Sequence, residues 1–232
     1  MKEAIAIITA RGGSKRIPRK NLKQFCGKEI LKYSIEAAWE SACFSEIMVS
    51  TDDKEIRDIA ITAGAKIPFM RSEKNSDDYT VTSDVLIEVL NNYQKQGDTF
   101  KYGFCIYPTA PFITGKKLRK AMQLLKEDKY DTVLPVVPFS FPPQRGIIIR
   151  DGYVNMREPE NLNMRSQDLE TVYHDCGQFY GFKVDVFLKS KKLIGNRTCP
   201  LFFNELEVQD IDNENDWKLA EMKYRYLQKM GD

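Results

Sequence analysis

The chain lacks a long apolar segment, a low-complexity tract and an excess of charge of either sign. No stretch approaches the ~18 consecutive apolar residues of a membrane-spanning helix, and the apolar run at residues 4–8 is too short for the core of a signal peptide. The 35 basic and 33 acidic residues give a net charge of +2, whereas a nucleic-acid-binding protein needs a strongly basic face. We therefore expect neither a membrane segment nor a nucleic-acid partner.

Signatures of disulfides and of hydrolases are missing as well. The cysteines are odd in number and widely spaced, form no C-x-x-C pair, and stand at positions 26, 43, 105, 176 and 199. Such cysteines are typical of free thiols in a reducing compartment, so we expect a cytoplasmic protein. The only histidine, His174, is accompanied by no G-x-S-x-G turn, which argues against a Ser-His-Asp hydrolase. His174 is therefore either a packed interior residue or part of another kind of site.

The most informative stretch is residues 5–21, which read IAIITARGGSKRIPRKN. Its apolar start predicts a strand buried on both faces, as in a parallel sheet. Gly12 and Gly13 then allow a sharp turn with unshielded amides, and five cations lie between residues 11 and 20. Without these five, the chain has 30 basic against 33 acidic residues, so its positive charge is local. The pattern predicts a phosphate-binding loop; the alternative is a solvated basic turn.

Two common phosphate-binding motifs are absent from this stretch. It lacks the G-x-G-x-x-G of dinucleotide-binding folds, and it lacks the second glycine of G-x-x-x-x-G-K-[ST]. The phosphate-binding mechanisms of these two motifs therefore cannot be assumed for this loop. The identity of its ligand depends on the rest of the chain.

Strand and helix patterns alternate along most of the chain. Apolar spacings of three and four predict helices at residues 28–42, 52–64, 83–96, from 114 onward, and through 217–227 with Asn213 as N-cap. Short apolar runs predict strands at residues 4–8, 46–51, 103–107, 132–137, 177–183 and 206–208. Pro135 suggests that its strand lies at an edge or bends. The alternation predicts a single α/β domain over residues 1–232, with a doubly wound, mostly parallel sheet.

Residues 139–175 differ in character from the rest of the chain. They contain prolines and polar turns, and Asp151-Gly152 between alternating residues predicts a hairpin over residues 147–154. An extended hairpin on a compact domain often serves a partner chain. We therefore expect an inserted arm that is used in dimerisation.

Polar features follow several of the predicted strands, at residues 10–21, 107–111, 174–178 and 210–212. Ligands of open α/β sheets bind outside the carboxyl ends of the strands, so these features are expected to converge on one site. Asp210 and Asp212 alternate along the backbone, which projects both carboxylates to one side, as a Mg²⁺ site needs. The alternative is that Asp212 or Asn213 only caps the last helix.

Residues 10–21, ARGGSKRIPRKN, resemble the signature of the acylneuraminate cytidylyltransferase family, the CMP-sialic acid synthetases and their relatives. The similarity continues in order through residues 50–52, Arg71 with Asp78, residues 108–111, Gly177 with Tyr180, and residues 210–212. It implies a three-layer α/β/α, Rossmann-like nucleotidyltransferase fold and a homodimer that exchanges the arm. It also implies Mg²⁺-dependent transfer of CMP from CTP to the anomeric hydroxyl of a nonulosonic acid, with release of pyrophosphate.

The resemblance implies roles for individual residues, each of which stands at a position that matches the family's motif. Nucleotide binding is expected from Ala10, Arg11, Gly12, Gly13, Ser14, Lys20, Asn21, Arg71, Thr80 and Thr82, the last three meeting the cytidine half and Asn21 the ribose. Catalysis by positioning and charge neutralisation is expected from Arg11, Lys15, Lys20, Asp210 and Asp212, with both aspartates as Mg²⁺ ligands. Sugar-binding candidates are Tyr107, Gln144, Arg165, His174, Gln178 and Tyr180.

Departures from the family pattern narrow the choice of sugar. Sialic acid enzymes usually read Gln-Pro-Thr-Ser-Pro at residues 107–111 and Arg-Pro-Asn-Gly-Ala at residues 174–178, where this chain has YPTAP and HDCGQ. These segments, with residues 139–145, resemble the pseudaminic acid branch, which serves bacterial surface glycan or flagellin glycosylation. The alternatives are a legionaminic or N-acetylneuraminic acid enzyme and, from another class, a non-catalytic CTP-binding regulator.

Overall fold

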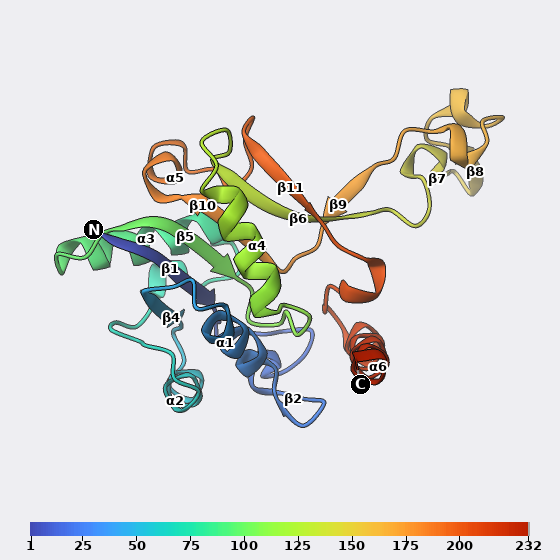
Figure 1. The fold of residues 1–232 in the computed structure, drawn as a ribbon. Helices are drawn as coiled ribbons and strands as arrows, with labels where there is room; N and C mark the ends of the chain where they lie inside the picture. Colours follow the sequence, from blue (N-terminus) through green and yellow to red (C-terminus); the bar gives the residue numbers. More distant parts are fainter. Residues whose placement is uncertain (232) are drawn as a thin grey trace.

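A computed structural model of the chain describes residues 1–231. Its centre is a seven-stranded sheet in the order β11-β6-β10-β5-β1-β4, with β9 also paired to β6 (Figure 1). The strands are β1 (Lys2–Thr9), β4 (Glu46–Ser50), β5 (Phe100–Ile106), β6 (Thr132–Pro138), β9 (Tyr173–Asp175), β10 (Phe179–Lys183) and β11 (Thr198–Phe202). Only β10 and the short β9 run against the others. The predicted α/β fold with a mostly parallel sheet is confirmed.

The first strand is buried on both faces. Ala4, Ala6 and Ile8 enter one core cluster, whereas Ile5 and Ile7 enter the cluster on the other face, and all five are fully buried. This arrangement explains the unbroken apolar run, because each successive side chain of a strand points to the opposite face.

Helices cover both faces of the sheet. α1 (Ile30–Ser41), α2 (Lys54–Thr62) and α4 (Gly115–Leu125) pack on one face, and α3 (Thr82–Lys95) and α5 (Val184–Ser190) pack on the other. The last helix, α6 (Glu214–Gly231), packs through Trp217 and Ala220 against Ile17 and Phe25, next to the short hairpin of β2 (Gln24–Phe25) and β3 (Lys28–Glu29). The C-terminal helix therefore supports the segment that follows the first strand. Within residues 1–231, no helix combines the length and the apolar character of a membrane span.

Of the two alternatives predicted from Pro135, an edge strand or a bend, the edge strand is wrong. β6 lies inside the sheet, between β11 on one side and β10 and β9 on the other. At Pro135, the pairing of β6 passes from β10 to β9, and the Pro135 carbonyl accepts a hydrogen bond from Cys176 N at 3.1 Å. Proline lacks a backbone N–H, but at this position one partner strand ends and the next begins. No hydrogen bond of the sheet is therefore lost.

The strand predicted at residues 206–208 is also wrong. A 3₁₀ turn occupies Glu205–Glu207, because Asn204 accepts from Leu206 N at 2.9 Å and completes a capping box with Glu207. The strand of this region lies earlier, as β11, and pairs in parallel with β6. Sequence patterns missed both β11 and the helix α5 before it.

The predicted hairpin is present. β7 (Ile147–Arg150) and β8 (Tyr153–Met156) pair in antiparallel register, and Asp151 and Gly152 turn with φ of 51° and 81°. Positive φ at both turn residues is the geometry that favours Asp-Gly. The hairpin stands away from the sheet, at the end of two segments that leave β6 and return as β9 (Figure 1).

Candidate active site

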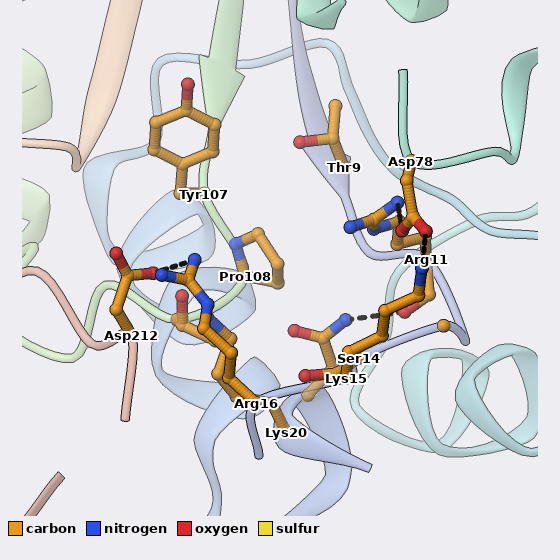
Figure 2. A pocket seen from close by; sticks show the side chains of 13 residues that line it. Thr9, Arg11, Ser14, Lys15, Arg16, Lys20, Asp78, Tyr107, Pro108 and Asp212 are labelled. Carbon is orange, nitrogen blue, oxygen red and sulfur yellow. Dashed lines mark hydrogen bonds and ion pairs between the residues drawn. The ribbon is translucent and has the colours of Figure 1, made fainter. Parts of the chain in front are cut away.

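A cavity of about 530 Å³ opens at the carboxyl ends of β1 and β5 (Figure 2). The opening loop, the segment after β5 and two further loops line it, through Thr9, Arg11, Gly13, Ser14, Lys15, Arg16, Lys20, Asn21, Asp78, Tyr107, Pro108, Thr109 and Asp212. Four of these side chains are cations and two are carboxylates. Because β1 and β5 are parallel neighbours, their following loops meet at one edge of the sheet. The cavity therefore concentrates positive charge where the first strand ends.

Tight packing fixes the glycine turn of the opening loop. Gly12 N donates to the Asp52 carboxylate at 2.8 Å. A Cβ atom on Gly12 would lie 2.8 Å from Oδ2 and 2.9 Å from Cβ of Asp53, so only glycine fits here. On the other side, the buried Asn21 donates from Nδ2 to the Arg11 carbonyl at 2.8 Å. These contacts hold the loop in one shape before any ligand arrives.

Carboxylates balance three of the cavity's cations. Arg11 Nη1 donates to Asp78 Oδ1 at 2.8 Å, and Lys15 forms an ion pair with the same carboxylate (Figure 2). Arg16 Nη2 donates to Asp212 Oδ1 at 2.6 Å. All of these groups remain partly exposed. A phosphate entering the cavity would therefore compete with carboxylates that already hold the cationic side chains.

The two remaining cations of the loop differ from each other. Arg19 has φ of 55° and pairs with Asp53 at 2.5 Å and with Glu55, outside the residues that line the cavity. Lys20 is half-buried in the cavity wall and donates from Nζ to the Ile211 carbonyl at 2.6 Å. Burial lowers the pKa of Lys20, and the nearby aspartates oppose this effect. Four of the five cations thus line the cavity, whereas Arg19 stabilises the loop through its ion pairs with Asp53 and Glu55.

Replacing Asp78 by asparagine is expected to strengthen CTP binding. The family resemblance implies that the cavity takes the triphosphate of CTP, which would have to displace this carboxylate from Arg11 and Lys15, and the substitution frees both cations. Exposed ion pairs are weak, so we expect the CTP dissociation constant to fall by a factor of about three in calorimetric titration. Asp84→Asn, which removes an equal charge from an exposed position in the first turn of α3, should leave it unchanged. Weaker binding by Asp78→Asn would mean that this carboxylate organises the cations.

A second compartment of about 360 Å³ adjoins the first. It is lined by Lys20, Tyr107, Thr109, Asp175, Gly177, Tyr180 and Asp210, of which the first three also line the larger cavity. The rings of Tyr107 and Tyr180 meet edge to face, with centroids 5.8 Å apart. Burial raises the pKa of both hydroxyls, so both are neutral at physiological pH. The structure thus joins a cationic compartment to one with aromatic walls and two carboxylates.

The acidic loop contributes one carboxylate to each compartment. Ile211 is 1% exposed and packs in the core, so Asp210 and Asp212 on either side of it face away from the core. Burial and the charge of Asp212 raise the pKa of Asp210. The predicted cap is confirmed, because Asn213 Oδ1 accepts two backbone N–H groups of the first turn of α6, at 2.9 and 3.1 Å. Capping therefore does not account for the Asp212 carboxylate, which contacts Arg16 instead.

The residues predicted for the cytidine half do not line either compartment. Arg71 is 8% exposed, and its guanidinium donates to Ser50 Oγ at 3.0 Å and to the Ser50 carbonyl at 2.6 Å. Thr80 Oγ1 bonds to the Asp77 carboxylate at 2.6 Å, and Thr82 is the first residue of α3. In this structure, Arg71 secures the end of β4, and the two threonines lie where the following loop joins α3.

Two of the predicted sugar residues are held elsewhere in the fold. Gln178 is 2% exposed and donates from Nε2 to the Glu207 carbonyl at 2.6 Å, so it supports the turn before the acidic loop. His174 is exposed on β9, and its ring lies against Phe139 with centroids 4.7 Å apart. It borders a separate cavity of about 290 Å³ that also reaches Asp210. Only Tyr107 and Tyr180 of the six candidates line the second compartment.

Gln144 and Arg165 lie on the arm. Gln144 Nε2 donates to the Glu170 carbonyl at 2.7 Å, and Arg165 pairs with Asp168 at 2.7 Å. The arm stands away from the sheet (Figure 1). Neither residue lines the two compartments within one chain. Their predicted role therefore requires the arm of a second chain.

The structure adds three residues that the sequence did not single out for a role. Arg16 belongs to the cationic stretch, and Asp78 to the family resemblance, so each had a signal in the sequence. Asp175 belongs to the HDCGQ segment that narrows the choice of sugar, but the sequence assigned no role to the aspartate itself. Only the folding of β9 against β6 brings it to the second compartment.

Comparisons with known proteins identify the family of this chain. The profile of the family described as Cytidylyltransferase matches residues 5–199. The chain belongs to this family. The pseudaminic acid cytidylyltransferase of Campylobacter jejuni subsp. jejuni is 34% identical, over 95% of this chain and 96% of the relative. The CMP-N,N'-diacetyllegionaminic acid synthase of Legionella pneumophila is also 34% identical, with 94% of each chain covered.

Solved structures share the fold of this cytidylyltransferase. A CMP:2-keto-3-deoxy-manno-octonic acid synthetase complexed with CTP superposes with a TM-score of 0.69 and 18% identity, covering 98% of this chain and 99% of the other. The 4-diphosphocytidyl-2C-methyl-D-erythritol synthase of Anaerococcus prevotii gives 0.64 and 17%, with the same coverage. At such identities the likeness concerns the fold alone, and it confirms the nucleotidyltransferase architecture.

Proposed function

We propose that the protein transfers CMP from CTP to the anomeric hydroxyl of pseudaminic acid, giving CMP-pseudaminic acid and pyrophosphate. The observation that carries the proposal is the junction of the two compartments, where a four-cation cavity meets a Tyr107–Tyr180 pocket at Lys20. A triphosphate fits the first compartment by charge, and a sugar fits the second by its aromatic and polar walls. Relatives that are 34% identical and named for this activity support the choice of sugar.

Charge neutralisation and positioning are the main tasks of the protein in such a reaction. Arg11, Lys15, Arg16 and Lys20 would hold the triphosphate, with Ser14 and the exposed backbone of Gly13 beside it. Lys20 borders both compartments, so its ammonium would lie where the sugar hydroxyl meets the α-phosphorus. In-line attack from the second compartment would expel pyrophosphate toward the cations of the first.

The acidic loop suits a magnesium ion. Asp210 and Asp212 face the same side, and the pKa of Asp210 is raised first by burial and then by the charge of Asp212, which a divalent cation would offset. Within residues 1–231 there is no cluster of three or more His, Cys, Asp or Glu ligands, and Mg²⁺ is usually held by one or two carboxylates together with substrate phosphates and water. Asp210 and Asp212 would hold the ion, which neutralises phosphate charge when bound.

Steady-state kinetics with three sugars test the proposal. Pyrophosphate release is measured with CTP and pseudaminic acid, legionaminic acid or N-acetylneuraminic acid, and the highest kcat/KM is expected for pseudaminic acid. A preference for legionaminic acid would assign the activity of the Legionella relative, and a preference for N-acetylneuraminic acid that of a sialate enzyme. Tight CTP binding without turnover of any sugar would indicate a non-catalytic CTP-binding regulator.

We further propose a cytoplasmic homodimer in which each arm docks on the other chain. A two-stranded hairpin is marginally stable alone in water, yet the side chains of Ile147, Ile149, Tyr153 and Val154 are 60–75% exposed. Ile149 and Val154 face each other across the hairpin, which gives it an apolar face with no cover from its own chain. A second chain would bury this face.

Replacing Ile149 by aspartate is expected to convert the dimer into a monomer. The change places a charge at the centre of the proposed interface, where its burial is costly. Size-exclusion chromatography with light scattering measures the mass. Asn155→Asp is the matched control, because Asn155 pairs with Ile148 on the other face of the hairpin. Equal masses for wild type and Ile149→Asp would contradict the role of the arm.

A further inference from the structure

Asp175 occupies a distinctive place in the second compartment. It is the last residue of β9 and lies two residues before Gly177, where the backbone turns with φ of 61°. Its Oδ1 accepts from Gly177 N at 2.8 Å, and its Oδ2 accepts from the Tyr180 hydroxyl. The carboxylate is half-buried and borders the compartment together with Tyr107 and Asp210.

The bond to Asp175 fixes the direction of the Tyr180 hydroxyl. A phenol carries one hydrogen, and Asp175 takes it, so the Tyr180 oxygen faces any ligand as an acceptor only. The carboxylate oxygens of Asp175 are acceptors as well. This part of the compartment therefore suits a ligand group that donates, such as a hydroxyl or an acylamino N–H.

We propose that Asp175 is a positioning residue that determines sugar recognition, by holding Tyr180 as an acceptor for a hydroxyl or acylamino N–H of the nonulosonic acid. The inference rests on the proposed function and extends it, since it assigns this wall of the second compartment to the donor groups of the sugar. Both oxygens of Asp175 accept hydrogen bonds from its own chain, one from Gly177 N and the other from the Tyr180 hydroxyl. Asp175 therefore acts through Tyr180.

A double-mutant cycle tests this arrangement. Asp175→Ala and Tyr180→Phe are each expected to raise the KM for the sugar about five- to tenfold, the usual effect of losing one hydrogen bond. The kcat and the KM for CTP should stay within about twofold, because the lost contact is made equally in the ground state and the transition state. The double variant should resemble either single variant, since one interaction is removed in all three.

Two further variants distinguish a specific effect of Asp175 from poor folding and from a general loss of negative charge. Asp175→Asn retains one acceptor oxygen for Tyr180, so its sugar KM should lie between those of wild type and Asp175→Ala, even if the alanine variant folds poorly. Asp185→Asn, at an exposed position in the first turn of α5, removes an equal charge and should match wild type. Thermal melts of each variant report folding separately.

The outcomes separate this inference from the proposed function. A wild-type protein that turns over none of the three sugars overturns the proposed function and this inference with it. An active wild type whose sugar KM is unchanged in Asp175→Ala and in Asp175→Asn overturns this inference alone. Additive effects in the cycle, or an equal rise in the KM for CTP, would also overturn it, because Asp175 would then act independently of Tyr180 or through the whole site.

Discussion

Replacing Lys20 by methionine is expected to lower kcat/KM for CTP by about 10²- to 10³-fold, the usual effect of removing one preorganised group that stabilises a transition state. Lys20 borders both compartments, and its ammonium is anchored on the Ile211 carbonyl at 2.6 Å. Its side chain is half-buried, so water replaces the lost charge poorly. Steady-state pyrophosphate release measures the effect.

Lys23→Met is the matched control for this substitution. Lys23 lies one turn further along and pairs with Glu214 at 2.6 Å, outside the residues that line either compartment. The same change of side chain should therefore leave kcat/KM within about twofold of wild type, because an exposed ion pair contributes little to stability. Near-wild-type turnover by Lys20→Met would remove Lys20 from the reaction and leave it as a support of the acidic loop.

Asp212→Asn is expected to lower turnover by about 10²- to 10³-fold, because the variant loses a proposed magnesium ligand on the phosphates. CTP binding measured without Mg²⁺ should persist and should be no weaker than in wild type. The structure gives the reason, since the carboxylate of Asp212 holds Arg16 at 2.6 Å, and the substitution frees that cation for the triphosphate. Single-turnover kinetics and calorimetry together separate the two effects.

Glu214→Gln provides the corresponding control for Asp212. It removes an equal charge two residues further on, from the exposed partner of Lys23. Turnover close to wild type is expected. If Asp212→Asn were equally active, Asp212 would serve only to hold Arg16, and the metal proposal would rest on Asp210 alone.

Features with a local physical cause could be predicted from the sequence. The apolar run of the first strand, the Asp-Gly hairpin turn and the Asn213 cap each depend on neighbouring residues, and all three are present in the structure. The two wrong predictions differ in cause. Pro135 is tolerated inside the sheet only because two partner strands meet at its position, which no local pattern shows, whereas the turn at Glu205–Glu207 forms through a local capping box between Asn204 and Glu207.

The α/β class, the cationic loop after the first strand and the cytidylyltransferase family could be predicted without coordinates, because they depend on short patterns and on the order of these patterns along the chain. Which of those residues share a site depends on how the chain folds. Arg11 meets Asp78 across 67 positions and Arg16 meets Asp212 across 196, while Arg19 turns away and Gln178 is buried. Side-chain partners so far apart in sequence are set by how strands and helices pack, and no local pattern encodes that packing.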